Sequence, residues 1–384
     1  MKIKTLLILL IFSAFAFGQT KTDSLKTKKN VQFSILGGPG YTPDYGFLVG
    51  GSALFTFSTD TKDSTLKRSV LPIAFAYMTA GGGSMIIRPQ LFFNHDRFRI
   101  FGQISMGNTI DNYYGVGYEK NSTMERSVDS TEYRNIGFRI NPIFLFRYKE
   151  SNLFYGGILD IASKGINDPS IGVQNDIDYI ADGGDHTGLK YLNIGLGVNL
   201  SYDTRDVPAN AYKGILIDFS SLFYSQNIGS SSDYTVYTMQ YKQFQQLKFI
   251  GERKVLSWML NGRFTSGNTP ITELSTIGSP YDLRGYYMGQ YRDKNAITSL
   301  VEYRHMFNAG DETKFKRILS KIGFATWVGI GSIDPNFKDW SGVMPNFGAG
   351  LRIELQPRMN FRIDFGHDPL NGQTLMYFNM TEAF

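Results

Sequence analysis

The chain has 384 residues and a formal net charge of +5; only 19% of its residues are charged, while 15% are aromatic. It contains no cysteine, which excludes disulfides, thiolate metal sites, iron–sulfur clusters and cysteine nucleophiles. The four histidines lie far apart, and the scattered lysines give no reason to expect nucleic acid as a partner. We therefore expect no metal and no cofactor. Low charge together with 41 glycines and many aromatic residues is typical of a transmembrane β-barrel.

The first residues have the pattern of a secretory signal peptide. Lys2 and Lys4 precede an apolar run from Leu6 to Phe12, and the small residues Ala16 and Gly18 follow it. The run is shorter than the roughly 20 apolar residues of a spanning helix, and no later stretch reaches that length. The sequence therefore predicts three segments, which are a signal peptide at 1–18, a short periplasmic segment at 19–30 and an outer-membrane barrel at 31–384.

Apolar and polar residues alternate with period two through most of the remaining chain. Every second residue of 192–203 is apolar or aromatic, and Asn, Gly, Ser and Asp fill the other positions. An apolar face suits lipid and a polar face suits a wet lumen, so we predict an all-β fold, a transmembrane antiparallel barrel of about sixteen strands. The predicted strands are 31–38, 44–58, 67–80, 83–93, 96–107, 132–148, 151–163, 189–203, 212–227, 232–248, 253–265, 295–307, 320–332, 343–356, 358–366 and 374–384.

The connections between these strands predict the topology. A periplasmic N-terminus makes the connections after odd strands extracellular, and these include the long segments 108–131, 164–188 and 266–294. The connections after even strands include the tight turns Asn94-His95, Lys149-Glu150, Gly251-Glu252 and Gln356-Pro357. Three connections are longer than this pattern predicts, at 59–66, 204–211 and 308–319.

The last predicted strand ends on an aromatic residue. Met376, Phe378, Met380 and Phe384 fall on one face of it, and Phe384 is the final residue of the sequence. An alternating apolar face with a terminal aromatic suits an edge strand that barrel-assembly machinery would engage. Glu382 interrupts the apolar series.

The long loop at 266–294 carries an Arg-Gly-aromatic tip formed by Leu283, Arg284, Gly285 and Tyr286. If this loop folds into the barrel, its arginine needs carboxylate partners, because a charge removed from bulk water must be paired. Alternation places three acids on the lumen face, which are Glu302, Glu354 and Asp364. In the alternative interpretation Arg284 stays in solvent, and the acids balance Arg352 and Arg362 locally.

This tip and a second motif, Tyr202-Asp203-Thr204-Arg205-Asp206, resemble the barrel domain of the BamA/TamA outer-membrane assembly superfamily, also called the bacterial surface antigen family. The resemblance covers roughly residues 31–384. It implies that the loop folds into the lumen and that Arg284 reaches Asp364 on a late strand, with Glu302 and Glu354 as further acidic partners.

The resemblance also implies a function and a location. It indicates an outer-membrane protein of a Gram-negative bacterium that aids membrane-protein insertion or transport across the outer membrane. Its partners would be outer-membrane lipid and either client outer-membrane proteins or a separate periplasmic partner. Family members with this activity carry periplasmic POTRA domains before the barrel, and 19–30 is too short for one. We therefore expect that the protein alone does not accelerate client insertion. The alternative function is a plugged channel for small solutes or lipids.

An outer-membrane enzyme is the weakest alternative. The sequence contains no Gly-x-Ser-x-Gly elbow. Asp111, Asp185-His186 and His367-Asp368 lie in or near predicted loops and could mimic a protease site, but solvated loop residues explain them more simply. We therefore predict that the protein is not an enzyme.

Overall fold

The computed structural model describes residues 30–42, 44–79 and 81–384, so the predicted signal peptide lies outside the described residues. In this part of the chain the main sheet contains 17 antiparallel strands, and β13 and β14 form a separate two-stranded sheet. The strands of the main sheet are β1 (Gln32–Thr42), β2 (Gly46–Phe57), β3 (Ser69–Met78), β4 (Gly83–Ile87), β5 (Gln90–Phe93), β6 (Phe98–Asn112), β7 (Glu132–Arg147), β8 (Leu153–Asn167), β9 (Leu189–Asp203), β10 (Gly214–Tyr224), β11 (Tyr234–Gln246), β12 (Lys254–Gly267), β15 (Asn295–Met306), β16 (Ile322–Asp334), β17 (Ser341–Gln356), β18 (Met359–Asp368) and β19 (Gln373–Met380).

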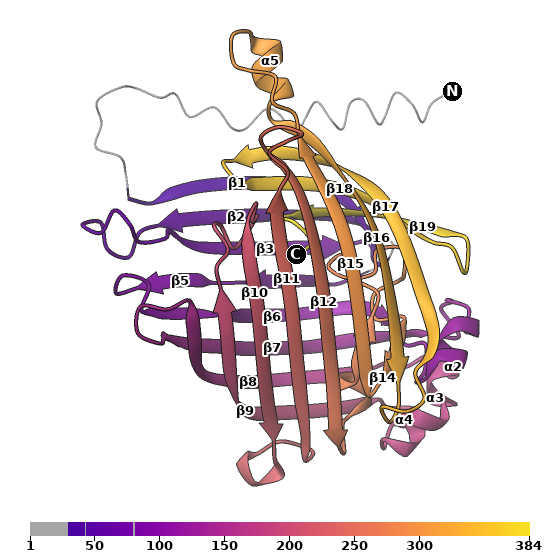
Figure 1. Ribbon diagram of the computed structural model, residues 1–384. Coiled ribbons are helices and arrows are strands. Elements are labelled where there is room, and N and C mark those ends of the chain that lie inside the picture. Colours follow the sequence, from indigo (N-terminus) through magenta and orange to yellow (C-terminus); the bar gives the residue numbers. More distant parts are fainter. Residues whose placement is uncertain (1–29, 43, 80) are drawn as a thin grey trace, which may run out of the picture.

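The strand pairing follows the order of the chain. Apart from β4 and β5, each strand of the main sheet pairs antiparallel with the next, and the sheet curls round until β1 and β19 lie side by side, with Cα atoms within 8 Å (Figure 1). β4 and β5 follow one another between β3 and β6, so they occupy one position and the described sheet has sixteen positions. Pro89 stands between them and cannot donate a ladder hydrogen bond, which explains the break. The prediction of about sixteen antiparallel strands is confirmed.

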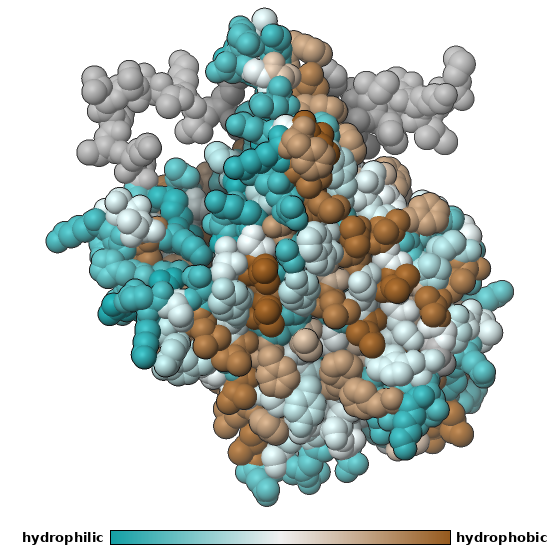
Figure 2. Space-filling view, in the orientation of Figure 1, coloured by the Kyte–Doolittle hydropathy of each residue, from teal (hydrophilic) through white to brown (hydrophobic). Residues whose placement is uncertain are grey.

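The two faces of the sheet have the polarity predicted from the alternation. On β9, Leu196 and Val198 are 53% and 56% exposed, whereas Asn193 and Asn199 are 0% and 5% exposed. Figure 2 shows hydrophobic side chains spread over the outer surface of the strands, with hydrophilic side chains gathered toward the ends. Polar side chains therefore lie in the lumen and apolar ones face outward, the reverse of a soluble sandwich. No helix among the described residues is long and apolar enough to cross a bilayer.

The two ends of the sheet carry different connections (Figure 1). One end, which we call the turn end, has the tight turns at 94–97, 148–152 and 357–358, and it also has the longer connections at 204–213 and 307–321. The opposite end, which we call the loop end, has most of the helices. The helices are α2 (Tyr118–Thr123), α3 (Ile171–Gln174) and α4 (Ile177–Ala181) at the loop end, α5 (Lys314–Leu319) at the turn end, and the 3-10 helices η1 (Gln226–Ile228) and η2 (Ile271–Glu273).

The last residues leave the sheet, and the prediction of Phe384 on the outward face of an edge strand is wrong. β19 ends at Met380, and Thr381 has a φ of +76°, which turns the chain inward. Phe384 is only 8% exposed and packs near Phe244 in the buried cluster inside the sheet. The interrupting Glu382 was the sequence signal for this turn, because a carboxylate on the lipid-facing side would be costly.

Candidate functional site

The loop between β12 and β15 lies inside the lumen. It contains η2 and a short hairpin of β13 (Ser275–Ile277) and β14 (Tyr291–Asp293), in which Thr276 pairs with Arg292. The tip of the loop, residues 278–290, lies between these two strands. Leu283, Arg284 and Tyr286 at the tip are each 0% exposed. The prediction of a long loop folded into the lumen is confirmed, and we call residues 268–294 the lumen loop.

Arg284 is held by two carboxylates on opposite sides of its guanidinium group. Its Nη1 donates to Asp364 Oδ2 at 2.8 Å, and its Nη2 donates to Glu302 Oε2 at 2.6 Å. The guanidinium also lies 3.5 Å from the centre of the Trp327 ring. Charge-assisted hydrogen bonds in a site with no exposed surface are stronger than those at a surface. Arg284 therefore anchors the loop tip to β15 and β18.

Glycine is required beside this arginine because the loop backbone lies directly against β18. Gly285 has a φ of +123°, and a Cβ atom there would lie 2.8 Å from the carbonyl carbon of His367. The amide of Gly285 donates to the Tyr377 hydroxyl at 3.0 Å, and its carbonyl accepts from Gln373 Nε2 at 2.8 Å. The Arg-Gly-aromatic tip is therefore fixed by its backbone as well as by its charge.

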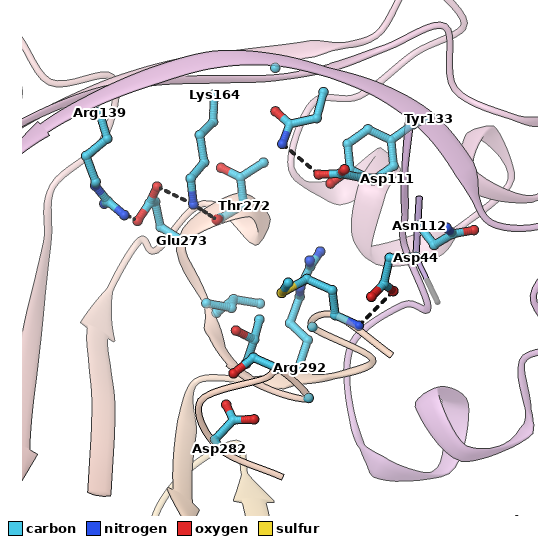
Figure 3. A pocket seen from close by; sticks show the side chains of 18 of the residues that line it. Asp44, Asp111, Asn112, Tyr133, Arg139, Lys164, Thr272, Glu273, Asp282 and Arg292 are labelled. Atoms are coloured by element: carbon cyan, nitrogen blue, oxygen red, sulfur yellow. Dashed lines mark hydrogen bonds and ion pairs between the residues drawn. The ribbon is translucent and has the colours of Figure 1, made fainter. Parts of the chain in front are cut away.

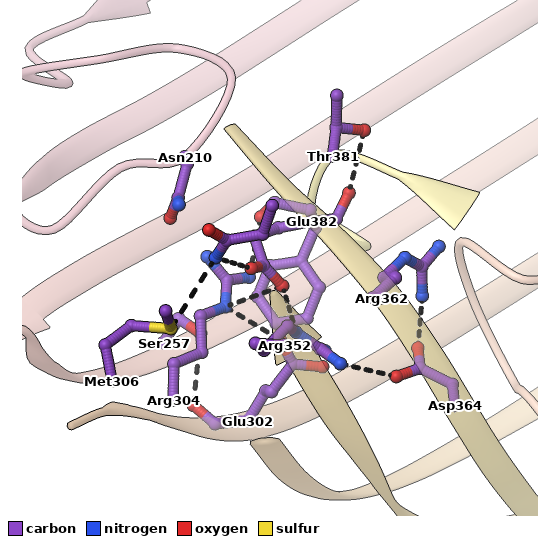
Figure 4. A network of polar contacts seen from close by, with 12 residues as sticks. Asn210, Ser257, Glu302, Arg304, Met306, Arg352, Arg362, Asp364, Thr381 and Glu382 are labelled. Atoms are coloured by element: carbon purple, nitrogen blue, oxygen red, sulfur yellow. Dashed lines mark hydrogen bonds and ion pairs between the residues drawn. The ribbon is translucent and has the colours of Figure 1, made fainter. Parts of the chain in front are cut away.

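The two carboxylates that hold Arg284 belong to a larger charged cluster inside the lumen, whose other members are drawn in Figure 4. Asp364 also accepts from Arg362 and, at 2.6 Å, from Arg352. The local pairing of the alternative interpretation is therefore present as well, but its solvated Arg284 is wrong, because Arg284 is buried. Glu302 accepts from Arg304 at 2.7 Å, and Glu382 accepts from Arg352 at 2.8 Å. Four arginines and three carboxylates thus share one buried network, which we call the arginine cluster; its members are Arg284, Arg304, Arg352, Arg362, Glu302, Asp364 and Glu382.

Two members of the arginine cluster were not identified from the sequence. Arg304 follows Glu302 by two residues on β15 and therefore lies on the same face, a signal that the alternation already contained. Its Nη2 also donates to the main-chain oxygen of Phe384 at 2.7 Å, so it ties the inward-turned last residues to the cluster. Glu382 reaches the cluster only because the chain turns at Thr381.

The third predicted acid, Glu354, does not join Arg284. It lies at the turn end of β17, where its Oε2 accepts from Arg253 Nη2 at 2.8 Å. Glu354 pairs in register with Asn360, whereas Asp364 pairs with Gly350, so the two acids are four residues, or roughly 13 Å, apart along the strands. Alternation predicted the correct face of the strand but carried no information about height in the lumen.

The residues of the motif 202–206 lie in three different environments. Tyr202 faces outward and is 40% exposed, whereas Asp203 is buried and accepts from Arg99 Nη1 at 3.0 Å and from Arg205 Nε at 2.9 Å. The Thr204 hydroxyl accepts from the amide of Ile215 at 2.8 Å. These bonds hold the end of β9 to the beginning of β10 and to the polar interior.

The same motif begins a segment, residues 204–213, that reaches across to the β17–β18 turn; we call it the strap. Asp206 Oδ2 accepts from Arg358 Nη2 at 2.9 Å, and the carbonyl of Asn210 accepts from Arg358 Nη2 at 2.6 Å. The Arg358 guanidinium lies 3.5 Å from the centre of the Tyr212 ring. Because Arg358 is far from the strap in sequence, only the tertiary structure shows this contact.

A polar cavity of about 350 Å³ separates the lumen loop from the wall formed by β6, β7 and β8 (Figure 3). Glu273 in the loop pairs with Arg139 at 2.9 Å and with Lys164 at 3.1 Å. Burial alone would raise the pKa of Glu273, but these two cations and Arg263 lower it to about 2. Burial raises the pKa of Asp282, on the loop side of the cavity, to about 6. Among the described residues, no three His, Asp or Glu side chains are placed so that together they could hold a metal ion.

The sequence matches the Omp85 superfamily domain over residues 49–379. The chain belongs to the Omp85 superfamily. It is thus an outer-membrane barrel of the assembly and translocation type, as the resemblance of the two motifs implied. Comparison with curated protein sequences gives no match.

Three solved structures are similar to this Omp85 barrel in fold. BamA from Haemophilus ducreyi lacking POTRA domains 1–3 has 13% identity and a TM-score of 0.58, covering 93% of this chain and 70% of that one. CdiB from Acinetobacter baumannii has 13% identity and a TM-score of 0.52, with coverages of 92% and 60%. CdiB from Escherichia coli has 8% identity and a TM-score of 0.57, with coverages of 93% and 63%. The chain thus spans 60–70% of the length of these proteins.

Proposed function

We propose that this Omp85 barrel, exported by its signal peptide to the outer membrane of a Gram-negative bacterium, aids the insertion of client membrane proteins or their transport across that membrane. No reaction is catalysed in this function. The observation that carries the proposal is the seam between β1 and β19.

This seam differs from every other contact between neighbouring strands. The strand pairs run from β1–β2 to β18–β19, and none of the paired registers in the described residues joins β1 to β19. Near the turn end, past the last paired residue of β19, a side chain of β17 reaches β1, because Gln356 Nε2 donates to the Ser34 hydroxyl. Unpaired backbone groups at such an edge can pair with an added strand, which is how a client strand would be received.

Locking the seam tests this proposal. Ser34→Cys and Gln356→Cys would be joined by a short bifunctional maleimide, which is possible because the chain contains no cysteine of its own. The matched control joins Thr235→Cys to Ser266→Cys, which are opposite one another in the β11–β12 ladder. Client folding is measured as the gel shift of a heat-modifiable barrel in outer-membrane vesicles that retain any separate periplasmic partner. We expect the seam lock, and not the control lock, to slow client folding; equal rates for the two locks would refute the proposal.

The polar cavity favours a second candidate, a plugged channel for small solutes or lipids. Charged side chains from both the lumen loop and the wall line it, so its interior is hydrated rather than apolar. Planar-bilayer recordings of the purified protein, with and without residues 268–294, test this function. A conductance that rises when the loop is removed would support a channel, and a seam lock that leaves client folding unchanged would favour it over assembly.

A further inference from the structure

The short helix α5 at the turn end exposes an apolar face. The Thr313 hydroxyl accepts from the Lys316 amide at 3.2 Å and so caps the first turn. Phe315 and Ile318 lie one turn apart on the same face and are 72% and 46% exposed. Large apolar side chains grouped on an exposed surface are typical of a site that contacts a membrane or another protein.

The neighbouring β11–β12 turn extends this apolar surface. Phe249 and Ile250 are 85% and 48% exposed there. Arg253, at the end of the turn, donates from Nη1 to the carbonyl of Ser320 at 2.6 Å and so joins the turn to the end of α5. We call this surface the rim patch, formed by residues 248–250 and 314–321.

Basic side chains surround the apolar residues of the rim patch. The part of the chain from Thr313 to Lys321 has four cations and no carboxylate. Lys316 pairs with Glu312 at 3.3 Å, but none of the other cations has a carboxylate within 4.0 Å among the described residues. The arginines of the arginine cluster each pair with a neighbouring carboxylate, and these other cations do not. The exposed cations are Lys248, Lys314, Lys316, Arg317 and Lys321, against the three nearby acids Glu252, Asp311 and Glu312.

An aromatic group on the outer face of the strands continues the rim patch toward the lipid-facing surface. His305 of β15 stacks on Phe324 of β16 with ring centroids 4.9 Å apart, and Tyr303 meets Phe324 edge-on at 6.2 Å. Aromatic girdles of this kind mark the level at which a barrel crosses from acyl chains to headgroups. α5 follows β15 directly, so the rim patch lies at the headgroup side of that girdle.

We propose that the rim patch binds anionic phospholipid at the membrane surface. Phe315 and Ile318 enter the boundary between headgroups and acyl chains, and the unpaired lysines and Arg317 contact the lipid phosphates. An amphipathic segment that combines exposed aromatic and aliphatic residues with Lys and Arg has the chemistry of such an interfacial site. The complementary charge of the headgroups selects lipid over an apolar protein surface as the occupant.

A fluorescent reporter beside α5 tests the proposal. Glu312→Cys carries an environment-sensitive fluorophore, and the full chain is reconstituted in phosphatidylcholine vesicles with or without phosphatidylglycerol. We expect nitroxide-labelled lipid to quench the reporter more strongly when phosphatidylglycerol is present. Soluble phosphatidylglycerol titrated into the detergent-solubilised protein gives the affinity.

Charge-matched variants separate the rim patch from general charge effects. Lys314→Gln, Arg317→Gln and Lys321→Gln together should weaken phosphatidylglycerol binding at least about tenfold, since each such cation contributes roughly fivefold near an anionic surface. Lys190→Gln, Lys294→Gln and Lys338→Gln remove the same charge from exposed positions at the loop end and should leave binding unchanged.

Three results would overturn the proposal. Equal quenching in both kinds of vesicle would show apolar insertion without headgroup selection. Equal loss of binding in the two triple variants would show that net charge alone matters. A reporter unquenched in either vesicle would show that lipid does not cover the patch, and cross-linking between copies would then identify a second chain as the occupant. The heat-dependent gel shift verifies that each variant is folded.

Discussion

We predict that Asp364→Asn loosens the lumen loop more than Arg284→Ala does, because the two changes leave different charge balances behind. The arginine cluster has four arginines and three side-chain carboxylates. Removing Arg284 leaves three arginines and three carboxylates, and each carboxylate that bound Arg284 keeps another arginine as a partner. Removing the charge of Asp364 leaves four arginines and two carboxylates, and three arginines lose the negative charge that they share.

The magnitudes follow from this difference. Leaving a buried charge without its partner costs about 3–5 kcal/mol, which is the range expected for Asp364→Asn. Arg284→Ala loses two charge-assisted hydrogen bonds and the contact with Trp327, but it leaves no unpaired carboxylate, so we expect about 2–3 kcal/mol. The exposed pair between Arg97 and Glu150 supplies a control, since Arg97→Ala should cost about 0–1 kcal/mol.

Chymotrypsin cleavage under native conditions measures how often the lumen loop leaves its docked position, since the loop tip contains Tyr281, Tyr286 and Tyr287. When opening is rapid, the cleavage rate follows the population of the open form. We expect it to rise more than about 100-fold for Asp364→Asn, roughly 30- to 150-fold for Arg284→Ala and less than about fivefold for Arg97→Ala. Bilayer conductance should rise in the same order if release of the loop opens the lumen.

The double variant decides whether Arg284 and Asp364 act as a pair. Its effect should be little larger than that of Asp364→Asn alone, which corresponds to a coupling energy of about 1–3 kcal/mol. Strictly additive effects would refute the pairing. A larger effect for Arg284→Ala than for Asp364→Asn would refute the argument from charge balance.

Three further predictions concern single positions. Gly285→Ala should release the loop as strongly as Arg284→Ala, because its Cβ would meet the backbone of β18; unchanged chymotrypsin sensitivity would contradict this. Burial raises the pKa of Asp282 from 3.8 to about 6. Between pH 3.8 and about 6 the Asp282 carboxyl group is therefore protonated in the docked loop and ionised in the released loop. Docking should therefore weaken as the pH rises from about 4 to about 6 and stay constant above it, and Asp282→Asn should remove this dependence in cleavage assays across that range. Arg358→Ala should lower the free energy that holds the strap against the β17–β18 turn by about 1–3 kcal/mol. Hydrogen exchange should then become faster at 204–213 and stay unchanged in the lumen loop.

The architecture could be predicted from the sequence because the lipid and the lumen each impose a simple local rule. Every lipid-facing position must be apolar and every second residue faces the lumen, so alternation over 189–203 located β9 at the residues where the structure has it. The inward loop was predicted for a related reason, because an arginine in an Arg-Gly-Tyr tip needs carboxylates if it leaves water. The family resemblance then selected Asp364 from three acids on the same face.

What alternation could not predict was position along the barrel axis. Glu302, Glu354 and Asp364 all share the lumen face, but only the registers between strands set their heights, and these bring Glu302 and Asp364 to Arg284 while Glu354 meets Arg253. The end of β19 was likewise decided by a turn at Thr381 that a period-two pattern does not contain.

The sequence by itself therefore determined the class of fold, the number of strands and the face on which each strand residue lies. These properties depend on local periodicity and on the difference in polarity between the lipid and the lumen. The tertiary structure decided which charges meet. The arginine cluster gathers residues from β15, β17, β18, the lumen loop and the last residues of the chain, and Arg358 reaches a strap 148 residues away. Pairing energies of this kind depend on distances of a few ångströms in a site shielded from bulk solvent, and such distances exist only after the sheet has curled.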